Sequence, residues 1–150
     1  MKHLFCYTLL IHLLLLSSCD HSRNIYYKAD PQTGALHELH LTNDTAMNWI
    51  LSADGSQYEW VNARYGWGLG HFMTDDKEYE WDTPVEITMT DRQMNATYQA
   101  DNIKIDVSRA FNKDGNLEET YRFTNTGTEK VELKDIAINT PFNDNYPDAR

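Results

Sequence analysis

The second half of the chain alternates between apolar and polar residues, and this two-residue period is the feature that most limits its fold. The apolar members of three successive segments are Val85, Ile87 and Met89, then Ile103, Ile105 and Val107, then Leu117, Tyr121 and Phe123. Side chains two residues apart lie on one face of a β-strand, so each segment is predicted to be a strand with one buried face. Asp114-Gly115, between the second and third segments, predicts a tight hairpin turn.

The rest of the chain adds short strands and no convincing amphipathic helix. Strands are expected at 25–29 and 36–41 (joined by a turn over 30–34), at 58–61, from Phe72 onward, and at 96–100. The stretches 62–70 and 78–84 have no clear period and are expected to be irregular. Short strands separated by turns are typical of an antiparallel β-sandwich, so an all-β sandwich is the predicted fold class.

The last predicted strand contains a change of register. Apolar residues occupy odd positions up to Leu133 and even positions from Ile136 onward. One extra residue in a strand moves the following side chains to the other face. We therefore expect a β-bulge or a bend at Lys134 and Asp135.

The first nineteen residues have the layout of a bacterial secretory signal peptide. A short polar start precedes an apolar run over residues 4–16, which is followed by two serines and Cys19. The run of about thirteen residues is shorter than the roughly twenty of a membrane-spanning helix. It also lacks the polar spacing of a soluble core helix. The Leu-Ser-Ser-Cys ending resembles a lipobox, which implies cleavage before Cys19 and lipid attachment to its sulfur.

This reading divides the start of the chain and predicts a location. Residues 1–18 are expected to be a signal-peptide helix and residues 19–24 a tether. The mature protein is expected to be exported and lipid-anchored in the cell envelope, at the outer membrane or on a periplasmic face. Cys6 lies in the predicted signal peptide and Cys19 would carry lipid, so no disulfide is predicted in the mature chain.

The net charge of -10 at pH 7 narrows the choice of partners. Nucleic acids bind through Lys and Arg that neutralise phosphates, so a nucleic acid is not an expected partner. Anionic lipid head groups also attract basic segments, so the only expected hold on a membrane is the lipid anchor.

Residues that carry catalysis or bind metals form no recognisable motif. The carboxylates cluster at Asp75, Asp76, Glu78, Glu80 and Asp82, with Asp144 and Asp148 near the end. Glycoside hydrolysis requires two carboxyl groups about 5 to 10 Å apart across a sugar, and clustering in sequence does not show that geometry. The histidines His37, His40 and His71 are too scattered for a metal signature, and the Gly66–Gly70 stretch lacks the Lys-Ser/Thr of a phosphate loop. No catalytic residue, metal or cofactor is predicted in this chain.

Aromatic residues are the best candidates for ligand binding. An aromatic ring offers a flat apolar face to the C–H groups of a sugar. Tyr65, Trp67 and Trp81 are the predicted carbohydrate contacts, and glycines beside the first two would allow close approach of a ligand. The alternative is core packing, which is expected for Trp49 and Trp60.

A longer stretch carries a family resemblance. Residues 123–138 read Phe-Thr-Asn-Thr-Gly-Thr-Glu-Lys-Val-Glu-Leu-Lys-Asp-Ile-Ala-Ile, and an early hairpin is centred on Asp-Pro-Gln-Thr-Gly at 30–34. Both resemble the supersandwich of the galactose mutarotase-like superfamily. The blocks 54–61, 65–70 and 139–149 look like parts of secreted polysaccharide-degrading proteins of gut Bacteroidetes.

The resemblance implies a domain organisation and a function. Such sandwiches lie at the N-terminus of many glycosidases and polysaccharide lyases whose catalytic unit is an (α/α)6 toroid. Residues 25–139 are expected to be the sandwich, and residues 140–150 a linker toward a missing C-terminal catalytic domain. The first hypothesis is an inactive N-terminal fragment of a glycoside hydrolase that acts on an oligo- or polysaccharide. A stand-alone glycan-binding lipoprotein and a structural cell-envelope domain are the alternatives.

Overall fold

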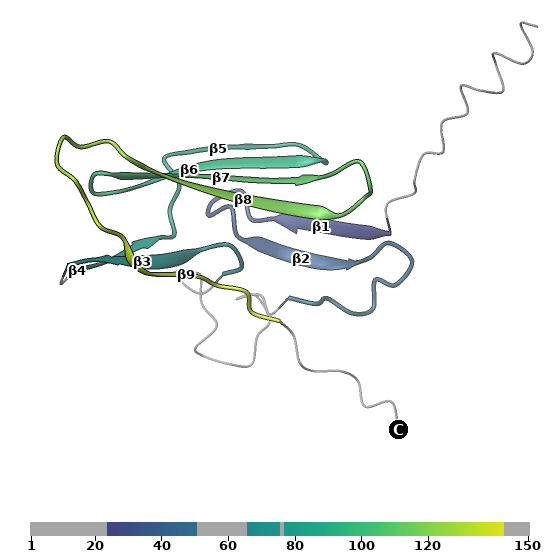
Figure 1. Ribbon diagram of the computed structural model, residues 1–150. Coiled ribbons are helices and arrows are strands. Elements are labelled where there is room, and N and C mark those ends of the chain that lie inside the picture. The colour runs from purple at the N-terminus through teal and green to yellow at the C-terminus, as the bar shows by residue number, and fades with distance from the viewer. Residues whose placement is uncertain (1–23, 51–65, 76, 143–150) are drawn as a thin grey trace, which may run out of the picture.

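The computed structural model describes residues 24–50, 66–75 and 77–142, and this part contains strands but no helix (Figure 1). The strands are β1 (Ile25–Ala29), β2 (Leu36–Leu41), β3 (Gly70–Thr74), β4 (Lys77–Trp81), β5 (Glu86–Met89), β6 (Gln93–Ala100), β7 (Ile103–Phe111), β8 (Leu117–Asn125) and β9 (Lys134–Ile138). All pairings between these strands are antiparallel, which confirms the predicted all-β class. The signal segment 1–18 and the predicted strand 58–61 lie outside the described residues.

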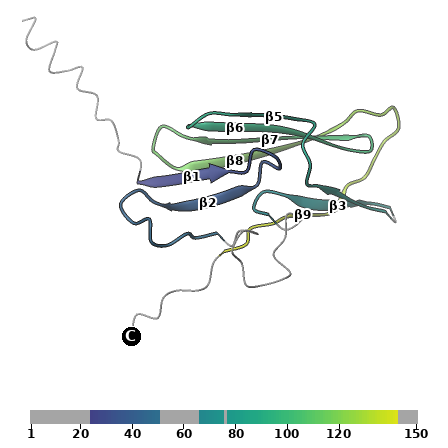
Figure 2. The same cartoon turned by 180° about the vertical axis from the view of Figure 1, so that it is seen from behind.

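The strands form two layers. One layer is a four-stranded meander in the order β5-β6-β7-β8. The second layer consists of the β1-β2 hairpin and the three-stranded sheet β4-β3-β9. Figures 1 and 2 show the meander facing both smaller sheets, with β1-β2 toward one end and β4-β3-β9 toward the other. Among the described residues, no helix is long and apolar enough to cross a membrane.

The core lies between these layers and follows from the predicted alternation. In β6 and β7 the buried residues recur at every second position, because alternate side chains of a strand point to the same face. The buried set in these two strands is Met94, Ala96, Tyr98, Ala100, Ile103, Ile105, Val107 and Arg109. The last member is charged, and its position is the starting point of the site described below.

An aromatic cluster fills the end of the core beneath β3 and β4. The Phe72 ring is stacked 5.4 Å from Tyr79, and the Trp81 ring meets Phe123 edge-on at 5.6 Å, both between ring centroids. Gly70 allows β9 and the Trp81 ring to pack closely against β3. A Cβ on Gly70 would lie 2.0 Å from the backbone oxygen of Ala137 and 2.6 Å from the Trp81 ring, so only glycine fits there.

The β-bulge expected at Lys134 and Asp135 is confirmed. His71 pairs with Ala137, but Met73 pairs with Lys134, so β9 carries one extra residue between these two pairs. Asp135 adopts a positive φ of 49°, the left-handed conformation found in many bulges. The bulge therefore accounts for the change of parity in the sequence.

Two expectations about the middle of the chain need correction. The stretch 78–84 was expected to be irregular, but residues 78–81 belong to the strand β4 (Lys77–Trp81). Tyr79 and Trp81 of this strand face the core, while charged residues cover its other face, as is common on edge strands. Val85 and Met89 were expected on a buried face with Ile87, but they are 68% and 37% exposed, just before and at the end of the edge strand β5, and only Ile87 packs against the core.

Candidate functional site

A charged pair occupies core-facing positions of β7 and β8. Arg109 and Glu119 are direct partners in the antiparallel register, and both continue the parity of the apolar residues in their strands. Arg109 is fully buried, and its Nε donates a hydrogen bond to Glu119 Oε1. Its Nη1 donates a second one to the backbone oxygen of Gly34 at 2.9 Å. A buried guanidinium needs such partners because an unpaired buried charge is very costly.

Glu119 also holds the indole ring of Trp67. The Trp67 Nε1 donates a hydrogen bond of 3.0 Å to Glu119 Oε2, the carboxylate oxygen that does not face Arg109 Nε. The backbone oxygen of Trp67 accepts a bond from Leu36 N at 2.9 Å. Trp67 is therefore fixed both at its side chain and at its backbone.

The half-buried Trp67 forms one wall of a surface hollow of about 270 Å³, which we call the Trp67 hollow. Its lining residues are Ile25, Leu39, Trp49, Trp67, Asn116, Leu117 and Glu119. The lining combines two indole rings with one carboxylate and one amide, the mixture typical of small-molecule sites. Phe142 meets the Trp67 ring edge-on at 4.7 Å between ring centroids.

Two tyrosines beside the charged pair are held in the neutral form. The Tyr98 hydroxyl donates a 2.6 Å hydrogen bond to the backbone oxygen of Thr33, and burial raises its pKa to about 12. Burial also raises the pKa of Tyr121, and the negative charge of Glu119 acts in the same direction. Neither phenol is thus poised to exchange a proton near neutral pH.

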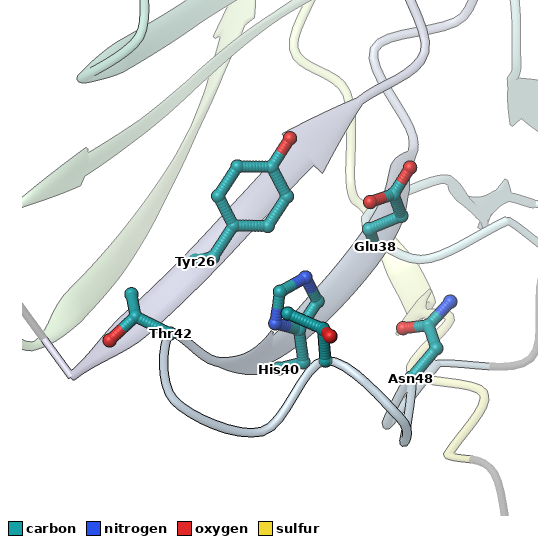
Figure 3. A pocket seen from close by; sticks show the side chains of 6 residues that line it. Tyr26, Glu38, His40, Thr42 and Asn48 are labelled. Carbon is teal, nitrogen blue, oxygen red and sulfur yellow. The ribbon is translucent and has the colours of Figure 1, made fainter.

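A second hollow, the hairpin hollow, lies on the outer face of β1 and β2. It has a volume of about 600 Å³ and is lined by Tyr26, Glu38, His40, Thr42, Thr45 and Asn48. Figure 3 shows the labelled side chains of β1 and β2 and the segment that follows β2 around this space. The rings of Tyr26 and His40 are stacked, with centroids 4.8 Å apart and planes inclined by 28°.

The structure separates the three aromatic residues predicted to contact carbohydrate. Trp67 lines a hollow, as described. Trp81 is only 1% exposed, and its Nε1 donates to the backbone oxygen of Gly68 at 3.2 Å. A ring packed in this way has no face to offer a sugar, so Trp81 is a core residue and its assignment as a contact is corrected. Tyr65 lies outside the described residues.

The carboxylates and histidines singled out in the sequence do not converge. Asp75 and Asp82 are exposed on either side of β4, and the side chain of Asp75 is 90% exposed. His37 and His40 lie on β2, whereas His71 lies on β3 in another sheet. The part of the chain that the structure describes holds no group of three or more His, Cys, Asp or Glu placed to bind a metal ion. Asp76, Asp144 and Asp148 are outside that part.

Sequence reasoning missed both the charged pair and the hairpin hollow. Arg109 and Glu119 continue the buried parity of two well-marked strands, and a charge at such a position is a usable signal. The pairing of Tyr26 with His40 had no comparable signal, because it depends on the register of the hairpin.

The fold and these hollows define an antiparallel β-sandwich domain with aromatic surface sites. A solved structure that resembles it in both sequence and fold is the polysaccharide lyase BACCELL_00875, with 43% sequence identity and a TM-score of 0.73. The similarity covers 83% of this chain but only 19% of the lyase, so this chain spans about a fifth of that protein's length. No protein-family model and no curated protein matches the chain.

Proposed function

We propose that this chain is the β-sandwich domain of a carbohydrate-active protein and that its role is to support a separate catalytic domain. The similarity to a polysaccharide lyase, at 43% identity over 83% of this chain, carries the proposal. The chain corresponds to 19% of that lyase, which leaves most of such a protein to other domains. The N-terminal placement, the mutarotase-like superfamily and the (α/α)6 toroid remain part of this proposal.

The reaction that we assign to the catalytic domain is elimination. The sequence resemblance implied a glycoside hydrolase, which adds water across the broken bond. The similar structure is named a lyase, and a lyase breaks a bond by elimination and leaves a double bond in one product. We therefore place this domain beside a polysaccharide lyase unit rather than a hydrolase unit.

The chemistry of the described residues supports a non-catalytic role. Both carboxylate oxygens of Glu119 accept hydrogen bonds, one from Arg109 and one from Trp67. The raised pKa of Tyr98 and Tyr121 keeps both phenols protonated. The described carboxylates around β4 do not line either hollow. Among the described residues, Glu119 is the only titratable side chain that lines the Trp67 hollow, so that hollow holds no pair of general acid and general base.

Exposed apolar residues near the end of the described part support a contact with a further domain. Ile136, Ile138 and Phe142 are 47%, 38% and 60% exposed. Phe142 touches Trp67, so a domain that covered these residues would also border the Trp67 hollow. Exposed apolar groups gathered in this way are typical of interaction surfaces. We propose that Trp67 lines a substrate cleft at this border.

A stand-alone glycan-binding protein is the second candidate, favoured by the two aromatic-lined hollows.

One experiment separates the supporting domain of a lyase from the stand-alone glycan-binding protein. The purified chain is incubated with a panel of polysaccharides, and elimination is followed by the ultraviolet absorbance of the new double bond. Affinity electrophoresis in gels that contain the same polysaccharides measures binding. We expect no cleavage by the chain alone and restored cleavage when it is joined to the catalytic domain. Cleavage by the chain alone would contradict the proposal, and tight binding that needs no other domain would favour the second candidate.

Attachment to the cell envelope through Cys19 is part of the same proposal and has its own test. The native gene and a Cys19→Ser variant are expressed in a Gram-negative host, and membrane and soluble fractions are compared. The native chain should sediment with membranes and the variant should not, because a durable hold on the bilayer takes more than one acyl chain and the variant lacks the sulfur that carries the lipid. Cys6→Ser is the matched control, since it changes a cysteine within the predicted signal peptide and should leave anchoring intact.

A further inference from the structure

We propose that the outer face of the β1-β2 hairpin is a second binding site, and that it holds a linear, uncharged oligosaccharide lying across Tyr26. The choice of a carbohydrate rests on the proposed function. The place and the shape of the ligand follow from the geometry of the hairpin, which is separate from the Trp67 hollow.

Tyr26 is the one lining residue that two hollows share. These are the hairpin hollow of about 600 Å³ and a second hollow of about 340 Å³. The second hollow runs between β1 and the turn that joins β5 to β6. Its lining residues are Tyr26, Tyr27, Lys28, Ala29, Met89, Thr90, Asp91 and Met94. Both volumes fall within the range of roughly 300–1,000 Å³ that is common for small-molecule sites. A ligand that fills both must cross Tyr26, which favours an extended chain of rings over a single ring.

The Tyr26 side chain is suited to carry a sugar. It is 41% exposed, although it is a large aromatic residue in a regular strand. Tyr26 and His40 are direct partners in the hairpin register, and their stacked rings support each other. The ring is therefore held in place before a ligand arrives, so little conformational entropy is lost on binding. A rigid aromatic face with a hydroxyl at its edge matches a pyranose ring, which has C–H groups on its faces and hydroxyls around its rim.

Asn48 makes the opposite wall of the hairpin hollow rigid. Its Oδ1 accepts hydrogen bonds from the backbone N–H of Leu39 at 3.0 Å and of Ile50 at 3.2 Å. Its Nδ2 donates to the backbone oxygen of His37 at 3.0 Å. These bonds tie the segment after β2 to β2 itself. The space between the aromatic pair and this segment is thus built into the fold.

His40 offers a defined hydrogen-bonding group to the ligand. Its Nδ1 lies 2.8 Å from the backbone oxygen of Leu41. A carbonyl oxygen can only accept, so Nδ1 carries a proton in this arrangement. In the neutral ring Nε2 is then an acceptor, suited to the hydroxyl of a sugar. The Thr45 hydroxyl and the Glu38 carboxylate add further polar groups around the same space.

The charges of this face favour an uncharged ligand. Lys28 Nζ lies 3.1 Å from Glu38 Oε1, so the cation two residues after Tyr26 in β1 is already paired. Asp91 adds a negative charge to the second hollow, and the whole chain carries -10. An anionic sugar in either hollow would lie beside Glu38 or Asp91, so we expect this second site, unlike the cleft where elimination takes place, to hold a neutral segment whose hydroxyls bond to the ion pair.

Amide shifts in ¹H–¹⁵N NMR spectra of the full chain test the proposal. The probes are cellohexaose, mannohexaose and xylohexaose, with hexagalacturonate as the charged counterpart. At least one neutral probe should shift the amides of Tyr26, His40 and Asn48, together with those of Thr90 and Asp91 across the second hollow. Its trisaccharide should shift fewer of them and bind more weakly. Hexagalacturonate should bind at least about tenfold more weakly than the neutral probe.

Three variants assign the binding to Tyr26. Tyr26→Ala should weaken binding about tenfold, and Tyr26→Phe, which keeps the ring, should weaken it much less. Asn116→Ala, which alters the Trp67 hollow, should leave these shifts unchanged. Thermal unfolding of each variant shows that the fold is kept.

If a probe binds and Tyr26→Ala binds it equally well, or if hexagalacturonate binds best, the hairpin site is wrong while the proposed function stands. If no carbohydrate binds to the chain at either hollow, the hairpin site fails, and cleavage restored by the catalytic domain still decides the proposed function.

Discussion

Glu119 joins the core of this sandwich to its surface by accepting a hydrogen bond from the Trp67 indole at 3.0 Å. The other carboxylate oxygen of Glu119 is bonded to Arg109, which is fully buried. The position of Trp67 in its hollow therefore depends on a charge in the core. Any change that moves Glu119 is expected to alter both stability and the shape of the Trp67 hollow.

Replacing Glu119 by Gln should destabilise the protein strongly. The amide keeps the shape of the side chain but removes the negative charge opposite Arg109, and a buried charge left without its partner costs about 3–5 kcal/mol. We expect the free energy of unfolding, measured with urea, to fall by about 3 kcal/mol. Glu132→Gln is the matched control, because Glu132 is exposed and this change should alter stability by less than about 0.5 kcal/mol. Equal effects of the two variants would show that the Arg109–Glu119 pair does not stabilise the core.

The strands were predictable from sequence to the extent that their period was visible. β7 and β8 have long apolar alternations and were predicted together with the turn between them, in which Gly115 adopts a φ of 82°. The bulge at Asp135 was predictable because one extra residue shifts the parity of the apolar residues. The strand β4 was not predictable, because charged residues on its exposed face obscure the alternation of Tyr79 and Trp81.

The sites were less predictable because they depend on which strands meet. Trp67 lies between two glycines and Trp81 between two acidic residues, and neither setting predicts burial; packing against Phe72 and Phe123 places Trp81 in the core. Tyr26 and His40 are fourteen positions apart and meet only in the folded register of β1 and β2. Composition can indicate that aromatic residues matter, but register and burial decide which of them reach the surface.

A Gly70→Ala substitution should disrupt the contact between β3 and β9. Its Cβ would lie 2.0 Å from the backbone oxygen of Ala137 and 2.6 Å from the Trp81 ring, so a strand must move. Overpacking of this kind typically costs about 1–3 kcal/mol, and we expect the upper part of that range because backbone is involved. Urea unfolding followed by Trp fluorescence measures the loss.

A substitution in an open turn provides the control for Gly70. A Cβ at Gly115 meets nothing within 4 Å, and the φ of 82° there is one that Asn tolerates better than most residues. Gly115→Asn should therefore change the free energy of unfolding by less than about 1 kcal/mol. A loss at Gly115 as large as that at Gly70 would mean that backbone conformation, rather than close packing, sets the cost.

Stability should fall at alkaline pH because Tyr98 holds its proton more tightly in the folded protein. Its pKa rises from 10.0 to about 12 on folding, with burial as the main cause. Below pH 10 both states keep this proton, so the stabilisation is fully present. Between about pH 10 and 12 the unfolded chain loses the proton first, and the free energy of unfolding decreases.

Urea unfolding between pH 9 and pH 12 measures this decrease, and Tyr98→Phe assigns it. The variant should be less stable at pH 9 by about 1 kcal/mol, because Thr33 loses the hydrogen bond that the Tyr98 hydroxyl donates at 2.6 Å. It should also show a shallower fall in stability above pH 10, since one of the two strongly shifted phenols is gone. Tyr79→Phe removes a hydroxyl that bonds to Asp101 at 3.0 Å on the exposed side, and it should keep the wild-type slope. A Tyr98→Phe protein with an unchanged slope would place the alkaline transition on other groups, with Tyr121 the first to examine.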